Sequence, residues 1–410
     1  HTFNEVHDVT AMVLYMQKDR QEQSSGLPYK KQSFVARASY GYDNRYMLES
    51  SFGLTGSENF AAGYRYGIFP SIGVAWYASN EAFMKGTEDI INKLKFRFSF
   101  GLTGNDNIGG NRFPYRGNLK TNAPGYNLGF NGGSGGGGTN NPGDGIIENN
   151  FAAPYLSWEI EEKKNLGFDL GLLRGRIDMS VDFFENKRRD ILMQRKTISA
   201  VTGFRQAPFQ NFGEMTNKGV DGNIIFKQNI NKVNLTFRGN ITYAKNKITE
   251  FDEVAPKYAY QAKTGQSLDK PLLYIDEGLY TDNDFIITTN PNDGSKNYEL
   301  KEGLPKPAAS VKPGDIKYKD LNNDNKIDSY DSTYDHKFYS QNPEWVYGFG
   351  LQGDYRGFYA GIFFQGVANA SVDTRFSPFS GGERFSVRRE VLDSHWSSST
   401  PDNQNVIYPR

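Results

Sequence analysis

The sequence predicts an all-β fold, a transmembrane antiparallel up-and-down β-barrel with long extracellular loops, of which this chain of 410 residues would form a part. Three observations lead to this prediction. Apolar and polar residues alternate over many segments, as they do in strands with one apolar face. Each segment is about ten residues long, the length that a tilted strand needs to cross a bilayer. Short and long connections also alternate, which a barrel with tight turns on one side and long loops on the other produces.

The clearest pair of strands lies between residues 166 and 184. Apolar side chains occupy every second position, at Leu166, Phe168, Leu170 and Leu172 in the first arm and at Ile177, Met179, Val181 and Phe183 in the second. An Arg-Gly turn at 174–175 joins the arms. This pattern indicates an antiparallel hairpin with one apolar and one polar face.

The same pattern, in chain order, predicts the other strands. It is weak at 3–15 and clear at 33–42, 46–55, 65–78, 95–104, 218–228, 233–247, 346–355 and 358–367. The short connections are 43–45, 174–175, 229–232 and 356–357, and the long ones are 105–154, 188–217 and 249–344. The connection 79–94, with a short helix at 88–94, is expected on the side of the short turns. About eleven strands are visible, whereas bacterial single-chain barrels have even numbers, so we expect further strands outside this sequence.

Composition narrows the class of protein. The chain contains no cysteine, which excludes disulfides and thiolate metal sites. Its 47 Lys and Arg residues balance 47 Asp and Glu residues, so no nucleic-acid partner is indicated. The 25 Tyr and 30 Phe residues would suit aromatic girdles at the two membrane interfaces. A soluble β-sandwich also alternates, but its strands usually have about five or six residues, so the barrel is favoured.

Five stretches resemble the SusC/RagA-type TonB-dependent outer-membrane transporters. They are 67–76 (GIFPSIGVAW), 94–105 (LKFRFSFGLTGN), 156–190, 211–220 (NFGEMTNKGV) and 313–328 (PGDIKYKDLNNDNKID). They follow the family's order over most of the chain. The resemblance implies part of a 22-stranded barrel across residues 1–410, with the plug domain, the TonB box and the last strands outside this sequence.

The resemblance also implies a function. The family imports large nutrients, oligosaccharides or peptides, through the outer membrane of Gram-negative bacteria. A SusD-like surface lipoprotein covers the barrel, the TonB complex supplies energy through the N-terminal region, and outer-membrane lipid surrounds the wall. This role is transport rather than enzymatic catalysis, and we assign no catalytic residues. Two alternatives remain at this point: a passive porin or adhesin barrel, and a secreted soluble β-sandwich that binds or acts on carbohydrate.

One motif within the long extracellular loop 249–344 has the spacing of an EF-hand calcium loop. Counting from Asp320, oxygen-bearing side chains occupy positions 1, 3, 5, 9 and 12, and the position-7 carbonyl completes the set. The candidate Ca²⁺ ligands are Asp320, Asn322, Asp324, the carbonyl of Lys326, Asp328 and Asp331. Asn325 replaces the usual glycine, and Asp331 replaces the usual glutamate. The alternative is an Asx-rich turn that only satisfies its own backbone. Calcium would stiffen the loop.

Residues near the long loops offer weaker signals. Phe151, Tyr155 and Trp158 lie where a loop meets a strand, and an interfacial aromatic belt is their expected role. Glu159 and Glu161 should share one strand face and Glu162 the other, as solvated or lumen-facing charges. The loops 105–154, 188–217 and 249–344 would shape a capture site, in which the sequence assigns no individual substrate contacts.

Overall fold

The computed structural model describes residues 2–4, 6–21, 29–107, 113–123, 145–203, 207–373, 389, 393–401 and 403–409. The chain divides into two compact units. The first comprises His1–Val254 and Glu344–Ala368, and the second comprises Ala255–Pro343 and Asn369–Arg410. No helix in the described ranges is both long enough and apolar enough to cross a membrane.

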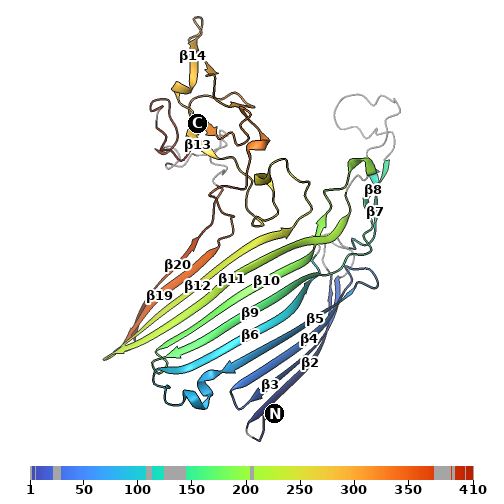
Figure 1. Ribbon diagram of the computed structural model, residues 1–410, viewed down its shortest axis with the longest axis vertical. Helices are drawn as coiled ribbons and strands as arrows, with labels where there is room; N and C mark the ends of the chain where they lie inside the picture. Colours follow the sequence, from blue (N-terminus) through green and yellow to red (C-terminus); the bar gives the residue numbers. More distant parts are fainter. Residues whose placement is uncertain are drawn as a thin grey trace. The chain divides into compact units, whose positions relative to one another are not determined.

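The first unit is built on one antiparallel sheet of twelve strands in the order β1-β2-β3-β4-β5-β6-β9-β10-β11-β12-β19-β20 (Figure 1). The strands are β1 (Thr2–Phe3), β2 (His7–Arg20), β3 (Tyr29–Tyr42), β4 (Tyr46–Ser57), β5 (Tyr66–Tyr77), β6 (Ile91–Asn105), β9 (Glu159–Leu172), β10 (Ile177–Gln194), β11 (Phe209–Ile230), β12 (Val233–Glu250), β19 (Trp345–Tyr355) and β20 (Phe358–Ala368). A separate hairpin, β7 (Asn118–Ala123) and β8 (Gly145–Asn150), lies within the connection from β6 to β9. The up-and-down order confirms the predicted fold class.

Connections at one end of this sheet are short, except for 78–90 between β5 and β6. The turn 356–357 has only two residues, and both have positive φ, +50° at Arg356 and +87° at Gly357. A two-residue turn of this kind matches the twist of the strands it joins, and glycine adopts the conformation without a steric cost. The connections 43–45, 173–176 and 231–232 lie at the same end, and the long connections lie at the other. The predicted alternation of short and long connections is therefore present.

Strand register separates an apolar face from a polar face. On β9 and β10, Leu166 pairs with Phe183 and Phe168 pairs with Val181, whereas Asp169 pairs with Ser180 on the opposite face. Leu166 is 54% exposed and Phe183 is 47% exposed, so the apolar face packs against no second sheet at these positions. Exposed apolar side chains continue along β12, β19 and β20. We call this apolar side the outward face and the polar side the inward face. A barrel in a membrane exposes such a face to lipid.

Ion pairs mark the end of the apolar band toward the long connections. On the outward face of β9, Glu162 and Lys164 form an ion pair of 2.7 Å. Glu185 on β10 and Lys218 on β11 form one of 2.6 Å. Charged side chains on the lipid face are costly at the bilayer centre and cheap near its interfaces. The strands therefore continue beyond the lipid layer on this side.

Three expectations about the elements are corrected. The stretch 3–15, weak in pattern, contains the end of β1 and the first part of β2, which continues to Arg20. The expected loop 188–217 spans only 195–208, because β10 extends to Gln194 and β11 begins at Phe209. The expected helix at 88–94, a stretch that the structure describes in full, does not form; the turns η1 (Ala78–Asn80) and η2 (Ala82–Met84) are 3₁₀, and β6 begins at Ile91. Strand pairing outweighed local helix propensity at this site.

The second unit consists of short strand pairs and turns around a small hydrophobic core. β13 (Asp276–Leu279) pairs with β17 (Ile316–Tyr318), β14 (Phe285–Thr289) pairs with β15 (Lys296–Leu300), and β16 (Lys306–Pro307) pairs with β18 (Lys326–Ile327). Tyr280 and Phe285 are buried there, with ring centroids 5.6 Å apart. The remaining 3₁₀ turns of the described chain are η3 (Ala200–Thr202), η4 (Ala259–Gln261), η5 (Asp282–Asp284) and η6 (Ser329–Asp331).

Candidate functional site: the inward wall and its mouth

An arginine and two aspartates link three strands on the inward face. Arg97 on β6 donates hydrogen bonds to Asp182 on β10, at 3.0 and 2.9 Å, and to Asp169 on β9, at 3.0 Å. Ser180 donates to the same Asp169 oxygen at 2.7 Å. The guanidinium crosses over Gly167, where an added Cβ would lie 2.4 Å from Asp182 Oδ1 and 2.8 Å from Arg97 Cζ. Glycine at this position therefore makes room for the network, which fastens the wall together.

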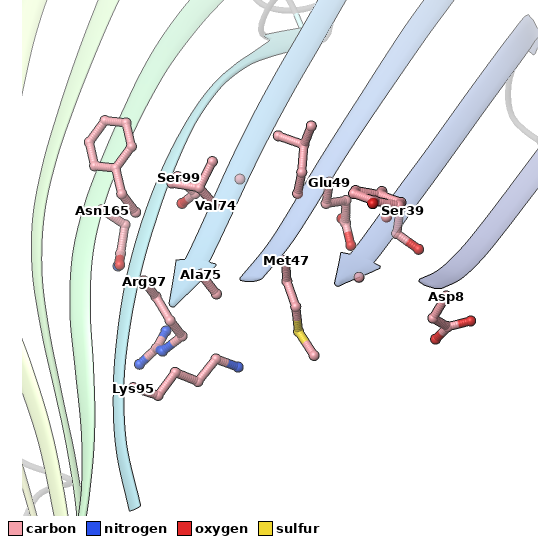
Figure 2. A pocket seen from close by; sticks show the side chains of 15 residues that line it. Asp8, Ser39, Met47, Glu49, Val74, Ala75, Lys95, Arg97, Ser99 and Asn165 are labelled. Carbon is pink, nitrogen blue, oxygen red and sulfur yellow. The ribbon is translucent and has the colours of Figure 1, made fainter. Parts of the chain in front are cut away.

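A shallow hollow of about 420 Å³ lies beside this network (Figure 2). Inward side chains from β2 to β6 and β9 line most of it, among them Asp8, Glu49, Lys95 and Arg97. Arg37 on β3 forms an ion pair with Glu49 on β4 at 2.5 Å. The wall thus presents charges of both signs to the interior. Such a surface suits contact with water, with polar solutes or with a polar protein surface.

A small aromatic core lies at the end of the sheet where the long connections begin. It contains Phe60, Leu156 and Trp158, which are 0%, 2% and 4% exposed. Phe69 on β5 packs edge-on against the indole, with centroids 5.2 Å apart. The indole N–H of Trp158 donates to the carbonyl of Arg65 at 3.0 Å. This core fastens the connection 58–65 to the segment that enters β9.

The prediction that Trp158 belongs to an interfacial aromatic belt is therefore wrong. Its side chain packs on the inward side, at the end of the sheet where the long connections begin, because the inward Phe69 and the buried Phe60 provide an apolar site there. Tyr155 is 78% exposed and stacks edge-on with Tyr64 at 6.2 Å. Alternation cannot detect such a core, since it depends on a contact between residues far apart in sequence.

The three glutamates that open β9 have different roles. Glu159 is 8% exposed, and its carboxylate accepts from Asn105 at 2.8 Å and from the backbone N–H of Leu192 at 3.1 Å. It is therefore a buried link between strands rather than a solvated charge. Glu161 pairs with Thr103 and shares the face of Glu159, while Glu162 points to the outward face, as predicted.

A buried carboxylate shapes the loop after β10. Asp252 is 4% exposed and accepts from Arg195 Nε at 2.9 Å and from Thr197 Oγ1 at 2.7 Å. The backbone N–H groups of Lys196 and Thr197 also donate to it. Burial alone would raise the pKa of Asp252, but these hydrogen bonds outweigh it and hold the pKa well below its usual range. Asp252 thus ties the start of loop 195–208 to the end of β12.

The candidate calcium loop closes on itself. Asp320 accepts from the backbone N–H groups of Asp324 and Asn325, at 3.3 and 2.8 Å. Asp331 is fully buried and accepts from those of Leu321 and Asp328, at 2.8 and 2.9 Å. Within the described ranges, no three or more His, Cys, Asp or Glu side chains are grouped to hold a metal ion. As placed, the carboxylates fit the Asx-rich turn better than a calcium cage, and calcium binding stays a prediction.

Sequence comparison identifies the family. Residues 15–275 match the family described as TonB dependent receptor-like, beta-barrel. The chain is 26% identical over 392 residues to TonB-dependent receptor P3 of Formosa agariphila, covering 92% of this chain and 34% of that protein. It is 30% identical over 222 residues to TonB-dependent receptor SusC of Bacteroides thetaiotaomicron, covering 53% of this chain and 21% of that protein. The chain thus spans about a third or less of these receptors.

Solved structures show the same fold. The structure of the RagAB peptide transporter superposes with a TM-score of 0.66 at 19% identity, covering 100% of this chain and 44% of that chain. The open-open state of the RagAB peptide importer gives 0.65 at 18% identity, covering 90% and 39%. The match to the family model over residues 15–275 identifies the family, and the solved structures agree in fold. The chain belongs to the TonB-dependent receptors of the Gram-negative outer membrane, with SusC/RagA-type receptors among its relatives, and it forms part of their β-barrel.

Proposed function

We propose that this chain forms part of the wall of an active transporter that imports large nutrients, oligosaccharides or peptides. The observation that carries the proposal is the two-faced sheet of twelve strands. Its outward face is an exposed apolar band, and its inward face holds charges of both signs, such as the Arg97 network and the Arg37–Glu49 pair. A lipid-stable wall around a polar interior is what passage of hydrated cargo requires.

Energy would come from TonB through the N-terminal region of the full-length receptor, and a SusD-like lipoprotein would cover the outer mouth. The likeness to RagAB, described as a peptide transporter, supports peptides as the cargo. The relative SusC supports the same class of receptor. Membership of the TonB-dependent family favours active import over a passive porin or adhesin. The exposed apolar band argues against a soluble sandwich.

Uptake measurements test this proposal. Deleting the full-length gene should abolish uptake of one labelled pool, either mixed oligosaccharides or mixed peptides, and inactivating TonB should have the same effect. Restoring the gene should restore uptake only when TonB is active. Uptake that continues without TonB would support a passive porin instead. A tagged receptor should also copurify with a SusD-like lipoprotein. If no such lipoprotein copurifies, the proposal that one covers the outer mouth would be contradicted.

Calcium binding by the loop 320–331 carries a separate prediction. If the loop binds Ca²⁺, ligand linkage should stabilise it by about 2.7 kcal/mol at a hundredfold excess over the dissociation constant. Limited proteolysis of the full-length receptor should then cut this loop more slowly in Ca²⁺ than in chelator. The variant Asp324→Asn should reduce the difference, and Mg²⁺ serves as the control ion. Equal rates of cleavage with and without Ca²⁺ would contradict calcium binding and favour the Asx-rich turn that satisfies its own backbone.

A further inference from the structure

The connection between β5 and β6 is an ordered structure in its own right. Residues 78–90 form the longest connection at the short-turn end among the described residues. Backbone bonds run from Glu81 N to Ala78 O at 3.1 Å, from Met84 N to Glu81 O at 3.0 Å and from Thr87 N to Met84 O at 3.0 Å. A plain link between two strands would need fewer residues and fewer bonds.

Glu81 fastens this connection to the outward face of the sheet. Tyr46 on β4 and Trp76 on β5 are paired neighbours on that face. The Tyr46 hydroxyl donates to Glu81 Oε1 at 2.5 Å, and the Trp76 indole N–H donates to the same oxygen at 3.0 Å. Arg45 donates to Oε2 at 3.1 Å. These bonds, led by that of Tyr46, hold the pKa of Glu81 below its usual value.

The aromatic rings around this tether form a belt at the end of the apolar band. Tyr42 and Tyr46 stack with centroids 6.5 Å apart, and the guanidinium of Arg45 lies over both rings. Trp76 stacks on Phe96 at 5.8 Å. Rings with a polar edge gather where a membrane protein crosses the headgroup layer. The outward side of this end therefore lies at the depth of the headgroups.

Beside this belt, the connection exposes a large apolar side chain. Phe83 in η2 is 69% exposed, although the turn around it is fixed by the bonds of Glu81 and Met84. The side-chain hydrogen bonds of Glu81 reach only residues of the outward face or the turn beside it, and Asn80 donates to the carbonyl of Asn44 at 2.7 Å. Phe83 therefore lies two residues from a side chain that is fastened to the lipid-facing side of the sheet.

We propose that residues 78–90 are an interfacial membrane anchor, in which Phe83 enters the headgroup region of the phospholipid leaflet on the short-turn side and Glu81 ties that insertion to the Trp76 belt. Apolar rings presented by a short amphipathic segment bind a bilayer in this way. The anchor would fix the height of the barrel in the membrane, whatever the transported cargo. The occupant is phospholipid, because Glu81 fastens the segment that carries Phe83 to the aromatic side chains of the lipid-facing side.

Fluorescence quenching tests the anchor in the full-length receptor reconstituted in phosphatidylcholine vesicles. The introduced indole of Phe83→Trp is followed as the difference in emission between this variant and the unmodified receptor. Phospholipid brominated near the headgroup should quench this added emission, whereas iodide in the water should not. The control Lys232→Trp, at the exposed tip of the β11–β12 turn, should show the reverse. Heat-modifiable migration on gels verifies that both variants fold.

The tether has its own readout. Adding Glu81→Gln to Phe83→Trp should lower the quenching by brominated lipid to about half, because a neutral amide holds Tyr46 and Arg45 less firmly. If iodide reached the indole introduced by Phe83→Trp as readily as the control indole, the anchor would be overturned. Shielding from both iodide and brominated lipid would also overturn it, since a protein surface would then cover the ring. Unchanged quenching after Glu81→Gln would overturn the tether.

Discussion

Replacing Ile241 by arginine is expected to destabilise the assembled barrel strongly. Ile241 lies on the outward face of β12, paired with Gly222 and Tyr347, and is 45% exposed. An arginine on the lipid face costs about 2–4 kcal/mol near the bilayer midplane. A cost of that size is a large part of the stability of a typical folded protein.

The adjacent residue provides a matched control. Asn240 lies on the inward face of the same strand, opposite Asn223 and Gly348. Asn240→Arg adds the same side chain to the polar interior, so it should leave assembly nearly unchanged. Folding of the full-length variants into vesicles, followed by heat-modifiable migration and urea unfolding, measures the difference. Equal stability of the two variants would mean that the two faces of this strand are assigned wrongly.

Replacing Asp252 is expected to free the start of loop 195–208. The alanine variant removes the acceptor of four hydrogen bonds, from Arg195, Thr197 and two backbone N–H groups. Leaving these donors without a partner costs about 1–3 kcal/mol for each that stays buried, and water can reach the half-buried Arg195. We expect local opening to become easier by about 2–3 kcal/mol. The isosteric Asp252→Asn should lose about half as much, because one carbonyl oxygen remains as an acceptor.

The stabilising effect of the Asp252 carboxylate should be constant at neutral and mildly acidic pH and should be lost only at lower pH. Because the folded pKa of Asp252 lies below the unfolded value of about 3.9, its contribution is fully present above that value. It is lost as the pH falls through the lower folded pKa. Amide exchange of residues 195–203 should therefore differ between the unmodified receptor and Asp252→Asn equally at pH 7 and pH 5. A difference that disappeared between these two values would contradict the role of the ionised carboxylate.

Alternation predicted the parts of the fold that cross the membrane. Leu166, Phe168 and their partners alternate because one strand face meets lipid and the other meets water, and the structure confirms that hairpin. Nearer the long loops both faces are polar, so the pattern fades while the backbone pairing continues. The ends of β10 and β11 were missed for this reason. The irregular pairing near Asp190, with a φ of +58°, has no pattern of its own.

The site was less accessible to sequence reasoning than the strands. Asp169 and Asp182 stood at inward positions, so their charges could be placed on the polar face, but their shared partner Arg97 comes from β6, more than seventy residues earlier. The same applies to Trp158 with Phe60, and to Asp252 with Arg195. In the second unit, Gln404 accepts from the backbone of Leu279 at 2.7 Å. Contacts of this range depend on the finished fold.

The length of β11 determines how far the sheet extends above the membrane. At about 3.4 Å per residue and a tilt of about 40°, its 22 residues rise roughly 55 Å, about twice the roughly 25 Å height of an apolar band. Outward residues turn from apolar to charged at Lys218, so the remaining half of the strand stands clear of the bilayer as a stiff collar. Under the proposed function, hydrated solutes would first contact the protein at this collar, above the headgroups.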